Sequence, residues 1–216
     1  MLRMTNVAAA SFSDYAVCVN EPLPIYILAG GKSSRFGADK ALARVGGHTL
    51  LESLATTLRP LASSLIVVAD RNDKYASLGF ETIADAVPGL GPMGGLKTAL
   101  SDCTARNSAQ EWLLLVSCDW AGVRPEWISQ LMQARTDRAQ VVAFKGENWE
   151  PLLALYHVGV AANVEAAIAL NQRAMWRLIE RSSPVALALP PDWSRAVQVN
   201  TPEALKRFLE HSSQGE

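Results

Sequence analysis

Short apolar runs without polar alternation constrain the fold of this chain more than any other feature. Ile25–Leu28, Leu65–Val68 and Trp112–Val116 each consist of consecutive apolar residues. A strand that is apolar on both faces is typical of a parallel sheet covered by helices on each side. Between these runs, apolar residues recur at helical spacing, as they do over residues 50–58. The pattern predicts a three-layer α/β domain with a mainly parallel, Rossmann-like central sheet.

The rest of the chain continues the alternation of strands and helices. Further strands are predicted at Glu81–Ile83, Val141–Phe144, Leu152–Tyr156, Val185–Leu189 and Val197–Val199. Further helices are predicted after Pro92, from Pro125 to about Arg135, near Val160–Leu170, at Met175–Glu180 and from Asn200 onward. Sheets of this kind bind ligands at the carboxyl ends of their strands. Residues that directly follow a strand are therefore the first candidates for a binding site.

Length, charge and cysteine content narrow the class of protein. We predict a single domain over residues 24–210 of the 216, a flexible extension at 1–23 and a short tail at 211–216. The chain has 20 Lys and Arg residues against 21 Asp and Glu residues. This balance indicates neither a nucleic-acid partner nor a polybasic surface for membrane binding. No apolar run is long enough to cross a bilayer. Three scattered cysteines fit the reduced thiols of a cytoplasmic protein.

The most informative segment is Leu28–Lys40, LAGGKSSRFGADK, which directly follows the first strand. Its glycines allow backbone N–H groups to approach an anion, and its cations can neutralise phosphate oxygens. The glycines are Gly30, Gly31 and Gly37, and the cations are Lys32, Arg35 and Lys40. A P-loop is excluded because its first glycine would fall at Tyr26. The segment predicts a triphosphate site, and the simpler alternative is a glycine-rich turn with solvated cations.

Two aspartates follow predicted strands and are candidates for a metal or nucleotide site. Asp119 comes three residues after Trp112–Val116, where a carboxylate can hold a Mg²⁺ ion shared with substrate phosphates. Asp85 follows the strand at Glu81–Ile83 and is a candidate for orienting nucleotide or metal. For both residues the alternative is a structural role at a strand end or as a helix cap.

The segment Gly89–Gly94 formally matches the dinucleotide fingerprint GxGxxG. Val87 and Pro88 precede it instead of a firm strand, so the match is weak evidence for NAD binding. We interpret these glycines as the approach to the helix that begins near Pro92.

The loop sequence resembles the signature of the molybdenum cofactor guanylyltransferases, which share the nucleotide-diphospho-sugar transferase-like α/β fold. The family pattern is roughly LAGG-x-S-x-R-M-G-x-D-K, and only Phe36 departs from it. The likeness extends from about Ile25 to Leu209. It includes Asp85, GPMGGLKTAL (91–100), VSCD (116–119), EPLLALYH (150–157) and VNTPEAL (199–205).

The resemblance implies roles for individual residues. It implies that GTP contacts Leu28, Ala29, Gly30, Gly31, Lys40, Asp85 and Asp119. It also implies that Lys40 contacts phosphate and that Asp119 is the Mg²⁺ ligand. Gly30 and Gly31 favour guanine, because related cytidylyltransferases carry LAAG in this turn. Two departures bear on specificity: Val68 stands near a polar position of the family, and Trp120-Ala121-Gly122 replaces a hydrophobic residue and proline.

These inferences predict a Mg²⁺-dependent nucleotidyltransferase that uses GTP and molybdopterin. The terminal phosphate of molybdopterin would attack the α-phosphorus of GTP, with Arg35, Lys40 and Asp119 as the catalytic residues. A phosphate monoester is largely dianionic at neutral pH, so no general base is needed. Alternatives are CTP as the nucleotide, a sugar phosphate as the acceptor, or a non-catalytic GTP-binding module. Transient contact with molybdopterin-delivering or molybdoenzyme-maturation proteins is a further expectation.

Overall fold

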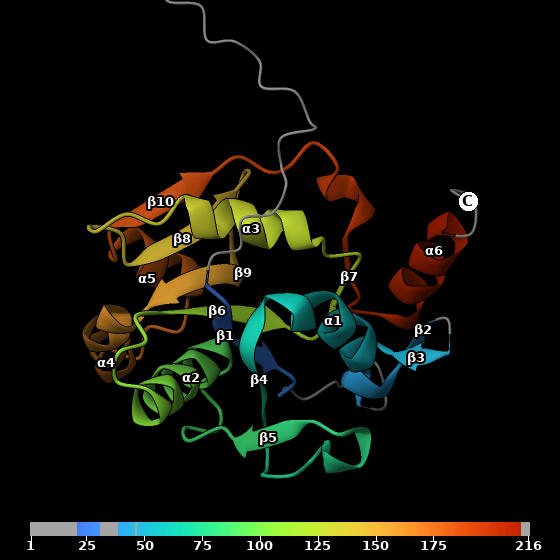
Figure 1. Ribbon diagram of the computed structural model, residues 1–216, viewed down its shortest axis with the longest axis horizontal. Coiled ribbons are helices and arrows are strands. Elements are labelled where there is room, and N and C mark those ends of the chain that lie inside the picture. The colour runs from blue at the N-terminus through green and yellow to red at the C-terminus, as the bar shows by residue number, and fades with distance from the viewer. Residues whose placement is uncertain (1–20, 31–38, 46, 213–216) are drawn as a thin grey trace, which may run out of the picture.

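A seven-stranded sheet forms the centre of the computed structural model, which describes residues 21–30, 39–45 and 47–212 (Figure 1). Its strand order is β10-β8-β9-β6-β1-β4-β5. The strands are β1 (Leu23–Leu28), β4 (Ala62–Ala69), β5 (Glu81–Ala84), β6 (Trp112–Ser117), β8 (Val141–Lys145), β9 (Trp149–His157) and β10 (Pro184–Leu187). Strand β9 is antiparallel to both of its neighbours, while every other pairing in this sheet is parallel. The predicted mainly parallel sheet is confirmed.

Helices cover both faces of the sheet. One face packs against α1 (Leu50–Leu58) and α3 (Pro125–Gln133). The other packs against α2 (Pro92–Arg106), α4 (Ala161–Ala169) and α5 (Met175–Glu180). Figure 1 shows α6 (Pro202–Ser212) at one end of the molecule, apart from these two layers. Each face of the sheet has its own apolar cluster, and the sheet separates them, as expected for a three-layer domain.

Local sequence signals account for where the helices begin. Helix α1 starts with a capping box, in which the Thr49 hydroxyl accepts from the Glu52 N–H and the Glu52 carboxylate accepts from the Thr49 N–H. Helices α2 and α3 begin at Pro92 and Pro125, as predicted. None of the described helices is long and apolar enough to cross a membrane.

Two small antiparallel ribbons lie outside the main sheet. Strand β2 (Arg44–Val45) pairs with β3 (His48–Thr49), and β7 (Trp120–Ala121) pairs with β11 (Val197–Gln198). Short 3₁₀ turns complete the described elements: η2 (Lys40–Leu42), η3 (Arg59–Leu61), η4 (Ala76–Leu78), η5 (Val158–Val160) and η6 (Trp193–Arg195). The β7–β11 ribbon brings the segment before α6 beside the end of β6. No strand was predicted at Trp120-Ala121, because two residues carry no detectable period.

Candidate active site

The carboxyl ends of four adjacent parallel strands form the candidate site. Gly30 follows β1, Asp70 follows β4, Asp85 follows β5, and Asp119 lies two residues beyond the end of β6. Neighbouring strands lie about 5 Å apart, so these positions share one edge of the sheet. Most of the predicted phosphate loop, including Gly31 and Arg35, lies outside the described residues.

The central feature of this edge is an ion pair between Lys40 and Asp119. The Lys40 Nζ atom lies 2.8 Å from Asp119 Oδ2, although the two residues are 79 positions apart in sequence. Lys40 Nζ also donates to Asn200 Oδ1 at 3.2 Å. Asp119 is only 8% exposed. The structure therefore brings together the end of the glycine-rich segment and the acid after β6, as the carboxyl-edge rule predicts.

One oxygen of Asp119 has no partner in residues 21–30, 39–45 and 47–212. Its Oδ1 atom is buried and accepts no hydrogen bond from the described protein atoms. An unsatisfied carboxylate oxygen is costly to bury, so the geometry leaves a binding position for a cation. No cluster of three or more His, Cys, Asp or Glu side chains exists within residues 21–30, 39–45 and 47–212. A single carboxylate fits Mg²⁺, which usually takes one or two carboxylates and shares its other positions with phosphates and water.

Lys40 is oriented by the residue before it. The Asp39 carboxylate caps the η2 turn by accepting from the Ala41 N–H at 3.1 Å. The other oxygen of Asp39 accepts from the Tyr75 hydroxyl at 2.9 Å and pairs with Lys74 Nζ at 3.0 Å. Burial alone would lower the pKa of Lys74, but its hydrogen bonds to Asp70 and Asp39 raise it overall. Residues of the β4–β5 connection thus fix the start of the turn that carries Lys40.

The predicted nucleotide-binding turn is hydrogen-bonded into the sheet. The Leu28 carbonyl accepts from the Cys118 N–H at 3.0 Å, and the Ala29 N–H donates to the Val68 carbonyl at 2.9 Å. The Tyr75 hydroxyl lies 3.3 Å from the Ala29 carbonyl oxygen. These bonds hold Leu28 and Ala29 at the carboxyl edge, next to the residue that precedes Asp119. Nucleotide contacts by Leu28, Ala29 and Gly30 stay a prediction.

Asp85 has structural partners in the connection between β5 and α2. Its Oδ1 atom accepts from the Val87 N–H at 2.9 Å and from the Thr98 hydroxyl at 3.2 Å. The first turn of α2 packs closely here, because a Cβ at Gly94 would lie 2.7 Å from the Val87 carbonyl oxygen. One oxygen of Asp85 therefore has the structural role at a strand end that was the alternative, although Asp85 does not cap α2. Contact between Asp85 and nucleotide stays a prediction.

The GxGxxG segment leads into a helix, as we interpreted it. Gly91 precedes α2 with φ +62°, a left-handed conformation that favours glycine. Pro92 then occupies the first turn.

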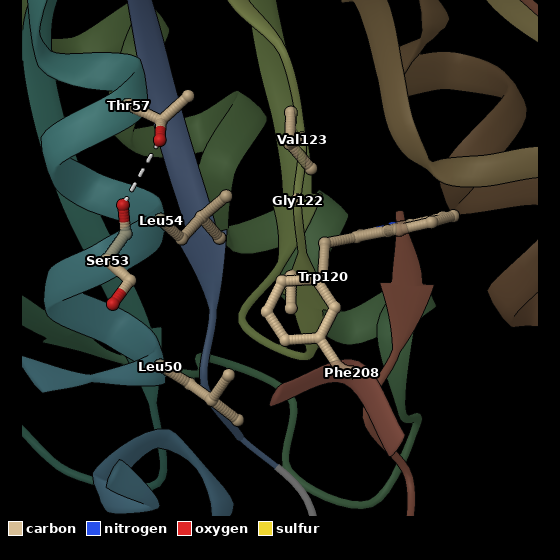
Figure 2. Close-up of a pocket in the computed structure, with 9 residues that line it drawn as sticks. Leu50, Ser53, Leu54, Thr57, Trp120, Gly122, Val123 and Phe208 are labelled. Atoms are coloured by element: carbon tan, nitrogen blue, oxygen red, sulfur yellow. Dashed lines mark hydrogen bonds between the residues drawn. The ribbon is translucent and has the colours of Figure 1, made fainter. Parts of the chain in front are cut away.

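Trp120 connects the candidate site to an apolar cavity. Its indole N–H donates to the Leu152 carbonyl at 3.0 Å, and its ring packs edge-on against Trp193. Figure 2 shows Trp120 at the wall of a cavity of about 220 Å³. The cavity is lined by Leu50, Ser53, Leu54, Thr57, Trp120, Ala121, Gly122, Val123 and Phe208. None of these residues carries a formal charge, so the cavity is unsuited to a triphosphate.

Cys118 is a buried core residue beside the site. Burial, followed by the neighbouring Asp119 charge, raises the pKa of its thiol to about 12. Such a thiol stays protonated at neutral pH, which supports the interpretation of Cys118 as a small hydrophobe and not a nucleophile.

Sequence reasoning missed Asn200, Lys74 and Tyr75 as site residues. Asn200 was interpreted as part of a helix start, yet the Thr201 hydroxyl accepts from the Ala204 N–H and caps that helix. The Asn200 side chain instead reaches Lys40, 160 positions earlier in sequence. Its only sequence signal was its place in VNTPEAL. Contacts at this separation depend on tertiary structure and have no local pattern.

The sheet order and the helices on both of its faces are those of the nucleotide-diphospho-sugar transferase fold. Among solved structures, molybdopterin-guanine dinucleotide biosynthesis protein A from Archaeoglobus fulgidus superimposes with a TM-score of 0.73 at 23% identity. The superposition covers 89% of this chain and 100% of the Archaeoglobus fulgidus chain. The 4-diphosphocytidyl-2C-methyl-D-erythritol synthase from Anaerococcus prevotii superimposes with a TM-score of 0.67 at 12% identity, covering 89% of this chain and 96% of that chain. At these identities the likeness shows the fold.

Sequence comparison identifies the family. The family model for the MobA-like NTP transferase domain matches residues 25–185. A molybdenum cofactor guanylyltransferase from Pseudomonas syringae pv. syringae is 33% identical, over 89% of this chain and 98% of the relative. A probable molybdenum cofactor guanylyltransferase from Carboxydothermus hydrogenoformans is 34% identical, over 87% and 95%. The chain belongs to the MobA-like NTP transferase family, and the resemblance of its glycine-rich segment to that family is confirmed.

Proposed function

We propose that this protein transfers GMP from GTP to molybdopterin, releasing pyrophosphate and forming molybdopterin guanine dinucleotide. The observation that carries the proposal is the contact between Lys40 and Asp119 at the carboxyl edge of the sheet. The names of relatives more than 30% identical over most of their length support the choice of substrates. A cytoplasmic location is part of the proposal and rests on the sparse, scattered cysteines of the sequence.

In this proposal Asp119 holds Mg²⁺ through the oxygen that has no protein partner. The ion, when bound, would neutralise phosphate charge. Lys40 supplies a mobile ammonium group for the phosphates of GTP. Arg35 supplies a planar guanidinium group for the transferring or leaving phosphate. Asn200 accepts a hydrogen bond from Lys40, and the Asp39 carboxylate caps the short turn in which Lys40 lies.

Catalysis then consists of positioning and charge neutralisation. The backbone at Leu28–Gly30 and the Asp85 segment line the side toward β4 and β5, where the nucleoside would bind. No residue is required to remove a proton, because the attacking phosphate monoester is already largely dianionic at neutral pH. This agrees with the absence of any histidine or thiol poised as a base at the described part of the site.

A pyrophosphate-release assay tests the proposal. Purified protein with Mg²⁺, GTP and molybdopterin should release pyrophosphate, and the same mixture without molybdopterin should release none. Replacing GTP by CTP should lower the rate. A preference for CTP would reassign the nucleotide, and GTP binding without any release of pyrophosphate would indicate a binding module.

A further inference from the structure

The Glu150 carboxylate is half-buried, and it has no partner within the part of the chain that the structure describes. None of the hydrogen bonds or ion pairs among the described residues includes its oxygens. Burial raises the pKa of this carboxyl, and no hydrogen bond or neighbouring charge contributes to the shift. A carboxylate that loses water without gaining a donor is destabilised, so Glu150 is poised for an external hydrogen-bond donor.

Glu150 lies at the same edge of the sheet as Asp119. Strands β6 and β9 run antiparallel, and the pair nearest this edge joins Val116 to Leu153. Asp119 follows Val116 and Glu150 precedes Leu153, so both lie beyond this pair, toward the same edge of the sheet. The hydrogen bond from the Trp120 indole to the Leu152 carbonyl shows that the two chains stay adjacent beyond Val116. Glu150 therefore lies on the side of Asp119 away from β1 and β4.

A bulge in β9 sets the position of Glu150. Between the pairs Ala143–Ala154 and Lys145–Trp149, β8 advances two residues while β9 advances five. The extra residues are held in place, because the Tyr156 hydroxyl donates to the Pro151 carbonyl at 2.9 Å. Bulges next to active sites commonly re-aim a side chain.

The neighbouring residues are also short of polar partners. The Trp149 Nε1 atom is buried and has no hydrogen-bond partner among the described atoms. The Lys145 Nζ atom lies 4.6 Å from the centre of the Trp149 ring, at the end of β8. The β8–β9 hairpin at the carboxyl edge thus carries an acceptor and a donor without partners among the described residues, and also a cation.

We propose that Glu150 is a specificity-determining residue of the acceptor subsite and accepts N–H bonds from a 2-aminopyrimidinone ring edge, as a pterin presents it. Such an edge carries two adjacent N–H donors, which a carboxylate can accept together. This inference rests on the proposed function, because the acceptor is taken to be molybdopterin. The phosphate of the acceptor then lies toward Asp119 and Lys40, and its ring toward the β8–β9 hairpin.

The experiment compares Glu150→Gln with Glu147→Gln, an exposed glutamate of the same hairpin. Steady-state kinetics should show the KM for molybdopterin raised about tenfold to a hundredfold in E150Q, as for a lost hydrogen bond to a charged group. The KM for GTP should be unchanged, and E147Q should match the unmodified protein. Calorimetric titration of molybdopterin without GTP gives a second readout, in which E150Q should bind correspondingly more weakly.

The outcomes separate the two proposals. If the unmodified protein releases no pyrophosphate from GTP and molybdopterin, the proposed function fails. If it does and E150Q keeps the KM of E147Q, the assignment of Glu150 fails alone. An increase in the KM for GTP equal to that for molybdopterin would also overturn it. Circular dichroism and thermal unfolding of both variants verify that they are folded.

Discussion

The two halves of the carboxyl edge differ in how their polar groups are satisfied. On the side of β1, β4 and β5, Asp39 is paired with Lys74 and Tyr75, and Asp85 is bonded to Thr98. On the side of β9, the Glu150 carboxylate has no described partner. Asp119 lies between, with one oxygen paired to Lys40 and the other unpaired.

This difference has a physical meaning. Paired groups are pre-organised and lose little freedom when a ligand arrives, so they suit the rigid positioning of phosphates. Unpaired groups instead gain hydrogen bonds from the ligand, and they reject a ligand that cannot supply them. Under the proposed function, the side of β1, β4 and β5 is the nucleotide half and suits positioning, and the side of β9 is the acceptor half and suits selection.

The largest expected effect comes from Asp119, where the two halves meet. Asp119→Asn keeps the size of the side chain and removes its charge, so turnover should fall about a hundredfold to a thousandfold. The measurement is pyrophosphate release at saturating GTP. Asp102→Asn, in an acid bonded to Tyr26 and Arg106, is the matched control and should leave the rate nearly unchanged. Full activity of D119N with Mg²⁺ would remove Asp119 from the mechanism.

The next effect separates the phosphate contact proposed for Lys40 from its ion pair with Asp119. Lys40→Met should lower turnover about a hundredfold, because a phosphate contact is lost. It should also tighten the binding of Mn²⁺ in the absence of nucleotide, since the ammonium 2.8 Å from Asp119 competes with a divalent cation for that carboxylate. Electron paramagnetic resonance measures free Mn²⁺. Lys97→Met breaks a pair with Glu165 elsewhere and should leave the affinity for Mn²⁺ unaltered; equal affinities in both variants would contradict the competition.

A smaller effect is expected from the residues that hold Asp39. Tyr75→Phe removes a hydroxyl that donates to Asp39 at 2.9 Å, so the free energy of unfolding should fall by about 1 kcal/mol. Lys74→Met should raise the KM for GTP more than the KM for molybdopterin. Urea unfolding and steady-state kinetics measure the two effects, with the exposed Arg71→Met as the control. Equal changes in both KM values would mean that Asp39 and its partners Lys74 and Tyr75 do not belong to the nucleotide half.

The smallest effect concerns the stability of the protein without ligand. The pKa of Glu150 is raised in the folded state, so its charge opposes folding once the pH exceeds the pKa of the unfolded chain. E150Q should therefore unfold at a higher temperature than the unmodified protein near pH 7. The difference should disappear in acid, where the carboxyl is protonated in both folded and unfolded states. Thermal unfolding across this range checks the sign, and a lower midpoint at pH 7 would indicate that Glu150 has a stabilising partner.

Much of the fold follows from the sequence, because buried strands and helix starts have local signals. The runs within β1, β4 and β6 are apolar on both faces, and Met175–Glu180 forms a helix with the predicted bounds. The antiparallel direction of β9 was not predicted, since the direction of a strand leaves no trace in its own residues.

The candidate site was predictable only where residues follow strands. Asp119 and the end of the glycine-rich segment were expected to meet, and Lys40 contacts Asp119. Lys74 and Glu150 gave no such signal. Lys74 pairs with Asp39 and has no direct contact with Lys40 or Asp119 among the described residues. Glu150 stands out only because its carboxylate is half-buried without a described partner, which no sequence pattern reveals.

The contact between Lys40 and Asn200 has a consequence for synthesis of the protein in the cell. These side chains are 160 positions apart, and the backbone of Val199 donates to the Asp119 carbonyl. A nascent chain still short of Asn200 lacks this brace on Lys40. The lysine therefore acquires its second contact only after synthesis has passed residue 200, long after the strands β1, β4 and β6 that border it.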